Sequence, residues 1–320
     1  MLFKNKKILI IGDVMVDSYL FGNVDRISPE APVPVVDIIV KQNKLGGAAN
    51  VASNVINLGG EPILCSVIGN DQKGDLFLSL LKKEKISEKY IYQSDSRITT
   101  CKTRIISSDN HQMLRVDEEM KSDLDSNEQN KLLSLINEIF NINNIDCVLF
   151  QDYDKGVLNE FIITTIINKA NSSNIPIVVD PKKKNFSYYK NVTLFKPNFK
   201  EFREGLNLIG TNRKLILEEG SKLLHKNKIE NVFVTLSENG IFVSYKKNNK
   251  IISKIIPGTP RDVADVSGAG DTVAAVASIL LNEIDIEEIA KISNMAGGIV
   301  CEEVGVVPID KEKLLKEYEI

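Results

Sequence analysis

The chain has 320 residues, of which 43% are hydrophobic, and its 40 basic and 43 acidic side chains give a formal net charge of −3. This length and balance predict a globular protein with one large or two modest domains, and they give no electrostatic case for nucleic-acid binding. The four cysteines lie far apart without a Cys-x-x-Cys spacing, so we expect reduced, mostly buried thiols. We also expect a cytoplasmic protein without a membrane span, because no apolar run is long enough and a strand begins too close to Met1 to leave room for a signal peptide.

The first part of the chain predicts a buried strand and then a separate small sheet. Residues 7–11 form a continuous apolar run that ends in Gly12 and Asp13. Since open α/β sheets bind ligands beyond the carboxyl ends of their strands, Asp13 and Asp17 are candidates for binding hydroxyl groups, and Asp17 equally suits a helix cap or a turn. Prolines beside a strand at 33–40 indicate an edge strand. Together with strands at 99–107 and 112–117 it predicts a lid, roughly residues 14–44 and 98–117.

Two neighbouring glycines open the first predicted helix, which begins near Lys44 and runs to about Leu58. Gly46 and Gly47 allow a ligand to approach the backbone, and Asn50 offers a donor and an acceptor from the first turn. Close packing of the helix is the alternative explanation for the glycine pair. On the second lid segment, Arg104 and Arg115 suit a substrate phosphate or are surface charges.

From Glu128 onward, helices and strands alternate regularly, which predicts a parallel sheet covered on both faces. The helices are expected at 128–140 and 159–171, and the strands at 146–150, 177–179, 193–196 and 231–236. Polar residues follow each strand, and with Asp13 they make five polar strand ends that should meet at one edge of the sheet: 151–156, 180–182, 197–201 and 237–240.

The segment from Asp265 to Asp271 precedes an apolar run at 272–281 that predicts a helix. Small residues at a helix N-terminus leave backbone N–H groups free to bind an anion, and Asp271 stands where a carboxylate could take a proton from an acceptor hydroxyl. Ordinary N-capping by Asp271 is the alternative. No lysine follows the glycines and the third glycine of a dinucleotide fingerprint is missing, while Ser267 lacks the flanking glycines of a nucleophile elbow.

Residues 46–50 and 265–271, in this order and at this separation, resemble the ribokinase-like (PfkB-type) sugar kinase superfamily over nearly the full chain. The chain is similar, within that superfamily, to the bacterial D-glycero-β-D-manno-heptose 7-phosphate kinases, the kinase half of the enzymes that make ADP-heptose. That second resemblance depends on residues 12–17, 26–35, 102–104, 112–117 and 152–156.

The resemblance implies one ribokinase-like α/β domain over residues 1–320, with a mostly parallel sheet flanked by helices and a small β lid. It implies ATP-dependent phosphorylation of the heptose 7-phosphate at O1, with Asp271 as the base and an anion hole formed by the amides of Gly268, Ala269 and Gly270. The implied sugar or sugar-phosphate ligands are Asp13, Asp17, Gly46, Gly47, Asn50, Arg104, Asp152, Lys155 and Lys182. The implied nucleotide, magnesium and phosphate residues are Asn198, Glu201, Thr235, Gly240 and Asn294, with Mg²⁺ held at Glu201 through water and a monovalent cation such as K⁺ at Asp265.

The same resemblance implies a homodimer, because the lids of such kinases often pair. Many heptose enzymes carry a second, nucleotidyl-transferring half, and this sequence stops at Ile320 without it. We therefore expect the bisphosphate to be activated by another protein. Three alternatives stay open: a kinase of another sugar or nucleoside, a catalytically silent sugar-binding protein, and a nicotinamide-dependent oxidoreductase.

Overall fold

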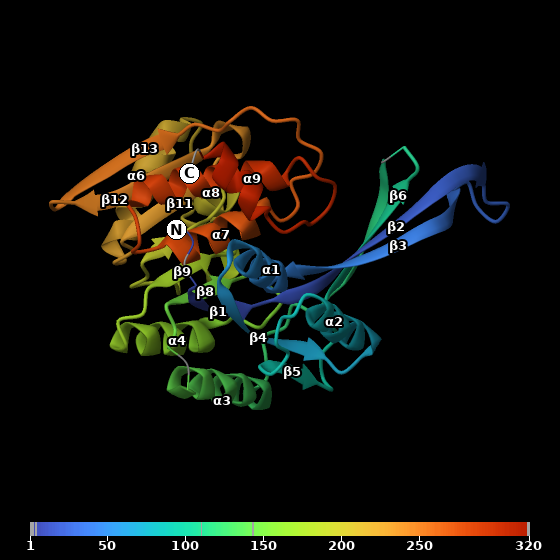
Figure 1. Ribbon diagram of the computed structural model, residues 1–320, viewed down its shortest axis with the longest axis horizontal. Coiled ribbons are helices and arrows are strands. Elements are labelled where there is room, and N and C mark those ends of the chain that lie inside the picture. Colours follow the sequence, from blue (N-terminus) through green and yellow to red (C-terminus); the bar gives the residue numbers. More distant parts are fainter. Residues whose placement is uncertain (1–2, 4, 110, 143, 319–320) are drawn as a thin grey trace.

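The structure is a computed structural model that describes residues 3, 5–109, 111–142 and 144–318, and it contains two β-sheets (Figure 1). The larger sheet has nine strands in the order β13-β12-β11-β10-β9-β8-β1-β4-β5. From β11 to β5 all neighbouring strands are parallel, and the hairpin β12–β13 continues the sheet in the antiparallel sense. The strands are β1 (Lys7–Gly12), β4 (Glu61–Gly69), β5 (Ile91–Ser94), β8 (Cys147–Gln151), β9 (Ile177–Asp180), β10 (Leu194–Phe195), β11 (Asn231–Thr235), β12 (Ile241–Lys247) and β13 (Lys250–Ile256).

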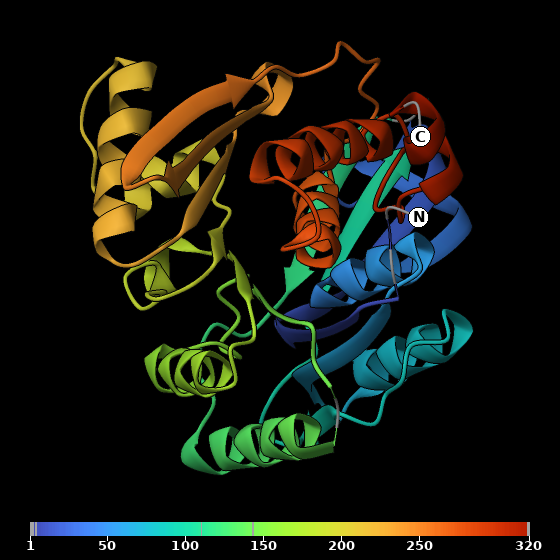
Figure 2. The same ribbon diagram turned by 60° about the vertical axis from the view of Figure 1, so that its left-hand side comes forward.

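Helices cover both faces of this sheet, and each face has its own hydrophobic core. Side chains that alternate along β1 enter the two cores in turn, which explains why its sequence is a continuous apolar run. Figure 2 shows the C-terminal helices, in orange and red, beside the blue α1. The first core includes α1 (Ala48–Leu58), α2 (Gln72–Lys83), α7 (Ala269–Leu280), α8 (Ile286–Val300) and α9 (Lys311–Glu317), and the second includes α3 (Ser126–Ile142), α4 (Glu160–Ser172), α5 (Phe199–Gly205) and α6 (Arg213–Lys226).

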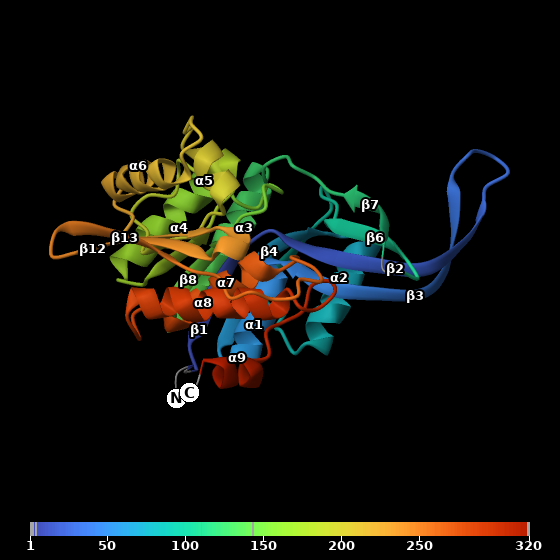
Figure 3. The same cartoon turned by 90° about the horizontal axis from the view of Figure 1, so that it is seen from above.

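The second sheet projects from the body of the molecule (Figures 1 and 3). Its strand order is β3-β2-β6-β7, with β2 (Val14–Ile27), β3 (Pro34–Gly47), β6 (Cys101–Ser107) and β7 (Gln112–Glu118). The pairing is antiparallel between β2 and β3, parallel between β2 and β6, and antiparallel between β6 and β7. The expected small sheet with β3 at its edge is therefore confirmed.

The start of the first helix differs from the prediction. Strand β3 continues through the glycine pair, because Lys44 pairs with Asp17 and Gly47 pairs with Val14. Gly47 has a φ of 60°, which ends the strand, and α1 begins only at Ala48. The glycines therefore lie on the strand and not in the helix.

Strand β5 and the hairpin β12–β13 were not predicted. The two-residue turn of the hairpin is Asn248-Asn249, both with positive φ (51° and 60°), so its sequence carried a turn signal. The thiols agree with the expectation, since Cys65, Cys101 and Cys147 are buried and free and Cys301 is half-buried and free. Over the described residues, no helix is both long and apolar enough to cross a membrane.

Candidate active site

The polar strand ends meet as predicted. Strands β11, β10, β9, β8 and β1 are consecutive parallel neighbours, so the residues that follow them share one edge of the sheet. The first turn of α7 comes to the same edge, because Asp271 lies within hydrogen-bonding distance of Gln151 at the end of β8. This edge is therefore the place where the predicted base and the strand ends come together.

Asp271 is the centre of a buried hydrogen-bond cluster. Its Oδ2 accepts a hydrogen bond from Asn50 Nδ2 at 2.8 Å. Its Oδ1 accepts two, from the Tyr153 hydroxyl at 2.7 Å and from Gln151 Nε2 at 3.0 Å. The side chains reach Asp271 from α1 and from the end of β8 with the loop that follows it, so two segments far apart in the sequence fix one carboxylate.

Burial raises the pKa of Asp271 to about 7, because a carboxylate loses its hydration there. The nearby Asp180 carboxylate adds to the increase, whereas the hydrogen bonds from Asn50 and Tyr153 and the charge of Lys196 oppose it. A carboxyl group with a pKa near neutrality can accept a proton and release it again at physiological pH, which is what a general base requires.

The structure excludes capping as the role of Asp271. The N-cap of α7 is Gly268, with a φ of 84°, and no side chain caps this helix. A Cβ on Gly268 would lie 2.9 Å from Asn50 Nδ2, so both the backbone conformation and the space favour glycine. Ala269 N donates only a long bond of 3.4 Å to Val266 O, and the first N–H groups of a helix have no partner within it. The turn 268–270 is thus suited to bind an anion beside Asp271.

A buried ion pair lies next to this turn. Lys196 Nζ is 3.0 Å from Asp180 Oδ2, and both side chains are at least 91% buried. A Cβ built on Gly270 would be 3.6 Å from Lys196 Nζ, so this cation adjoins the predicted anion hole. Gln151 Nε2 also donates to Asp180 Oδ2 at 3.0 Å, which links the ion pair to Asp271 through one amide group.

Asp17 lies on β2 of the second sheet. Its Oδ1 pairs with Arg104 NH1 at 2.5 Å, and both side chains are mostly buried, so neither the helix-cap alternative for Asp17 nor the surface-charge alternative for Arg104 holds. A Cβ on Gly46 would overlap Asp17 Oδ2, which makes close packing a sufficient reason for that glycine. Arg115, by contrast, is half-exposed and pairs with Asp117, as a surface charge would.

Two of the predicted sugar ligands have their carboxylates engaged inside the protein. Asp13 accepts backbone hydrogen bonds from Tyr153, Lys155 and Val157, so it shapes the loop after β8. Burial raises the pKa of Asp13 to about 6, and the neighbouring Asp152 contributes to the increase.

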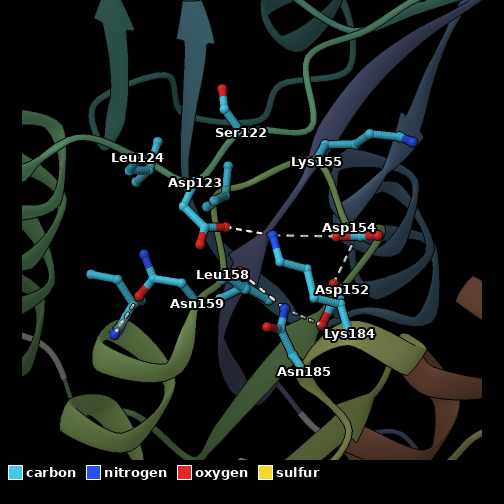
Figure 4. A network of polar contacts seen from close by, with 12 residues as sticks. Ser122, Asp123, Leu124, Asp152, Asp154, Lys155, Leu158, Asn159, Lys184 and Asn185 are labelled. Atoms are coloured by element: carbon cyan, nitrogen blue, oxygen red, sulfur yellow. Dashed lines mark hydrogen bonds and ion pairs between the residues drawn. The ribbon is translucent and has the colours of Figure 1, made fainter. Parts of the chain in front are cut away.

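Asp152 is also internally bonded (Figure 4). Its Oδ2 accepts from Asn185 Nδ2 and from the Tyr189 hydroxyl, both at 2.9 Å, and its Oδ1 accepts from the Asp154 amide. Burial raises the pKa of Asp152. Contact of Asp13 or Asp152 with a sugar stays a prediction.

The predicted lysines each hold an acidic partner. Lys155 Nζ lies 2.8 Å from Glu119 Oε2, just beyond β7. Lys182 pairs with Glu201, and its Nζ lies 5.2 Å from the centre of the Tyr153 ring. Burial lowers the pKa of Lys182, but the acidic groups Asp180 and Glu201 together outweigh it, so the pKa is raised. Lys182 thus connects Tyr153, beside Asp271, with Glu201.

Asn198 and Glu201 form a capping box at the start of α5: each side chain accepts a hydrogen bond from the other's backbone N–H, both at 2.9 Å. Thr235 forms a parallel bridge with Asn198 at the end of β11. Thr235, Asn198 and Glu201 therefore lie together at the sheet edge, on the side of β10 and β11.

Gly240 and Asn294 flank one loop. Asn294 Nδ2 donates to Pro257 O at 2.9 Å, and a Cβ on Gly240, whose φ is 89°, would lie 2.6 Å from Gly258 N. This loop directly precedes the 265–271 segment in the chain, and contact of Gly240 or Asn294 with a nucleotide stays a prediction.

The candidate metal ligands differ in how well they fit. Magnesium takes few protein carboxylates and keeps several waters, so Glu201 at the mouth of α5 fits a contact through water. Asp265 accepts from the amides of Ser267 at 2.9 Å and Gly305 at 3.0 Å, so its carboxylate joins two loops. Among the described residues, no group of three or more His, Cys, Asp or Glu side chains could hold a metal by itself.

A pocket of about 540 Å³ adjoins this cluster through Asn50. It is bounded by β3, α1, α2 and residues 306–308, and Asp271, Gln151 and Tyr153 do not line it.

Four residues of the cluster were not named as site residues: Gln151, Tyr153, Asp180 and Lys196. The first three lie in the polar strand ends 151–156 and 180–182, which were predicted to meet, whereas Lys196 was assigned to the strand at 193–196. What the sequence did not indicate is which polar residue at each strand end turns toward Asp271.

Comparisons with known proteins agree with this geometry. The family model described as pfkB family carbohydrate kinase matches residues 5–313. The protein named bifunctional protein HldE of Helicobacter hepaticus is 37% identical over 314 residues, which are 98% of this chain and 64% of the relative. The HldE protein of Nitratiruptor sp. is 39% identical, over 98% of this chain and 65% of the relative. The chain thus spans slightly under two thirds of the length of these relatives.

Solved structures show the same fold. Phosphofructokinase-2 from Escherichia coli in complex with potassium superposes with a TM-score of 0.79 at 19% identity, covering 99% of both chains. Ribokinase from Arabidopsis thaliana complexed with ribose and ATP superposes with a TM-score of 0.74 at 17% identity, covering 99% of this chain and 100% of the other. The expected ribokinase-like α/β fold is therefore confirmed. With the family match over nearly the whole sequence, the chain belongs to the pfkB family of carbohydrate kinases.

Proposed function

We propose that this kinase phosphorylates D-glycero-D-manno-heptose 7-phosphate at O1 with ATP, giving the 1,7-bisphosphate used for ADP-heptose and the lipopolysaccharide core. The observation that carries the proposal is the buried, three-way hydrogen-bonded Asp271 beside the turn 268–270. The choice of sugar is supported by the heptose-kinase motifs in the sequence and by relatives named bifunctional protein HldE.

In this proposal Asp271 takes the proton of the sugar hydroxyl while that oxygen forms its bond to the γ-phosphorus of ATP. The N–H groups of the turn 268–270 stabilise the charge of the transferring phosphoryl group. The buried Lys196, adjoining Gly270, adds a positive charge on the same side. ADP leaves as the bond from phosphorus to its β–γ bridging oxygen breaks.

Positive side chains on the second sheet and after strands β8 and β9 would hold the phosphate that the sugar already carries. Arg104 and Lys182 are the stronger candidates. Arg104 pairs with Asp17, which packs against Gly46, and Lys182 lies near the ring of Tyr153, beside Asp271. Lys155, paired with Glu119, is further along the loop. Arg104 also suits this role chemically, since a guanidinium group can form bidentate hydrogen bonds to a phosphate.

Magnesium belongs to the proposal as the ion that neutralises the ATP phosphates when bound, with Glu201 and Asn198 orienting its waters. Potassium at Asp265 is a further part, to be tested by comparing rates in K⁺ and Na⁺ salts. We place the reaction in the cytoplasm.

A homodimer formed through the second sheet also belongs to the proposal. This sheet is proposed to act as the lid. It exposes large apolar side chains to solvent, which is unfavourable in a monomer, and their exposed fractions are Ile38 48%, Ile39 67%, Val40 43%, Leu114 55% and Val116 44%. Light scattering at micromolar concentration should give the mass of two chains, and a monomeric mass would argue against the pairing.

The test of the function is ADP release with ATP and magnesium across heptose 7-phosphate, unphosphorylated heptose, ribose, fructose, fructose 6-phosphate and adenosine. We expect a strong preference for heptose 7-phosphate. A preference for another acceptor would keep the kinase and overturn the heptose assignment. No turnover with any of them would favour a silent sugar-binding protein.

A further inference from the structure

The Tyr153 hydroxyl makes the shortest hydrogen bond to Asp271 in the cluster, at 2.7 Å. The sequence motifs give Tyr153 no role in binding or catalysis. Tyr153 begins its loop with its amide bonded to Asp13 Oδ2 at 2.8 Å, so the loop backbone is anchored just where the side chain departs. Its ring lies 5.2 Å from Lys182 Nζ. Tyr153 is therefore fixed at its backbone amide by Asp13 and at its hydroxyl by Asp271, so the hydroxyl is a fixed hydrogen-bond donor.

The hydrogen bonds on Asp271 are unevenly distributed between its two oxygens. A carboxylate offers about four lone-pair positions, two on each oxygen. Oδ1 uses both of its positions, for Tyr153 and for Gln151, whereas Oδ2 uses one, for Asn50. With the partners that the described residues supply, one position is left for an incoming hydroxyl, and it is on Oδ2.

Gln151 strengthens this asymmetry. Its amide nitrogen carries two hydrogens and lies 3.0 Å from Asp271 Oδ1 and 3.0 Å from Asp180 Oδ2, so each hydrogen can serve one carboxylate. Gln151 cannot leave Asp271 without also leaving the Asp180–Lys196 ion pair. Tyr153, in contrast, donates to Asp271 alone and is the partner that a substitution can remove cleanly.

We propose that Tyr153 is a positioning residue for the phosphoryl transfer: with Gln151 it fills Oδ1 of Asp271, keeps this buried carboxylate ionised, and leaves Oδ2 as the atom that takes the proton from the sugar hydroxyl. The proton moves from the hydroxyl to Oδ2 as the sugar oxygen bonds to the γ-phosphorus, and it returns to solvent after ADP departs. This inference rests on the proposed role of Asp271 but not on which sugar is used.

The removal of the hydroxyl in Tyr153→Phe tests the proposal. A hydrogen bond to a charged group favours the ionised form, so its loss should raise the pKa of Asp271 by about one unit or more. We expect the acid limb of the kcat/KM profile to move up by the same amount, with a loss of roughly fivefold at pH 7 and a smaller loss above pH 9. The KM for ATP should change little. A general loss of structure would lower activity equally at every pH.

Tyr189→Phe is the matched control. The Tyr189 hydroxyl also donates to a buried carboxylate, Asp152 Oδ2 at 2.9 Å, but it has no bond to Asp271. Its removal should leave the acid limb where it is in the unmodified enzyme. An equal shift in both variants would overturn the proposal, and so would an unshifted acid limb in Tyr153→Phe.

A spectroscopic measurement separates this inference from the function. In protein labelled with ¹³C at the aspartate side-chain carboxyl, the Asp271 resonance is identified by its absence in Asp271→Asn, and its titration should move upward in Tyr153→Phe. If no acceptor is phosphorylated, the proposed function fails while this titration still decides the role of Tyr153.

Should Tyr153→Phe not fold, the unmodified chain gives the answer. With ¹³C at the tyrosine ring carbon that bears the hydroxyl, one of the eight tyrosine resonances should follow the ionisation of Asp271 and should stop doing so in Asp271→Asn. If no tyrosine resonance titrates with Asp271, the proposal is overturned.

Discussion

Replacing the base without changing its shape is the most informative change, and Asp271→Asn does this. The amide oxygen of the new side chain can keep the hydrogen bonds from Tyr153 and Gln151, but its NH₂ group then faces Asn50 Nδ2, donor against donor. Asn50 could turn its amide around only by giving up its contact with Asn54 Nδ2 at 3.3 Å. We expect a loss of about 1–3 kcal/mol in the free energy of unfolding from the unsatisfied pair.

The effect on turnover should be much larger than the effect on stability. A positioned general base contributes about 10²- to 10⁴-fold, which corresponds to roughly 3–5 kcal/mol of the activation free energy. The assay is ADP release at pH 8, where most Asp271 side chains of the unmodified enzyme are ionised because their pKa is about 7. Sugar binding, measured by calorimetry, should persist, since the anion-binding turn and the second-sheet residues Asp17 and Arg104 are unchanged.

Asp310→Asn controls for the chemical change itself. Asp310 caps α9 through the amides of Glu312 and Lys313, and asparagine caps helices equally well, so activity and stability should not change. Turnover of Asp271→Asn within tenfold of the unmodified enzyme, with the protein folded, would refute the assignment of Asp271 as the base.

Other predictions address the surroundings of the base. Because the pKa of Asp271 is raised to about 7 and only the ionised form takes a proton, kcat/KM should fall about tenfold per pH unit below 7 and level off above it; a flat profile from pH 5 to 9 would contradict this. Lys196→Met should lower the free energy of unfolding by about 3–5 kcal/mol in denaturant titrations, because it leaves Asp180 buried without its cation, and adding Asp180→Asn should recover most of the loss. An additive double variant would show that the pair is not coupled. Arg104→Met should raise KM for a phosphorylated sugar more than for its unphosphorylated counterpart, and equal increases for both would remove Arg104 from phosphate binding.

The sequence predicts the main sheet well because its strands signal their environment directly. Strand β1 is buried on both faces and reads as an unbroken apolar run, and the regular alternation after Glu128 requires parallel neighbours. The same reasoning misplaced the start of α1, although Gly46 and Gly47 disfavour a helix interior, because the pairing of this segment with β2 is not visible in the local sequence. Strand pairing is a long-range property that local preferences do not carry.

The site was predictable in part for the same reason. Asp271 could be found because a local motif, small residues before an apolar helix, has a chemical meaning by itself. Its partners Asn50, Gln151 and Tyr153 lie 221, 120 and 118 residues away, and no local pattern shows that they converge. For Asp13 the sequence indicated a polar strand end but not that its carboxylate also bonds the backbone of Tyr153 and Val157.

The arrangement of charge explains how a carboxylate can act as a base beside an anionic phosphoryl group. Asp180 and Asp271 would repel each other and the ATP phosphates if they stood alone, and the repulsion from Asp180 does raise the pKa of Asp271. Lys196 neutralises Asp180, and its charge counteracts the increase in the pKa of Asp271. In the proposed reaction, the positive end of α7 would lie beside the transferring phosphoryl group. Burial therefore makes Asp271 basic enough to take a proton, while Lys196 and the hydrogen bonds keep it ionised near neutral pH. A variant that exposes Asp271 should lower its pKa and weaken the base, so activity should fall at high pH. A variant that removes Lys196 or a hydrogen bond should raise this pKa, so activity should fall at low pH.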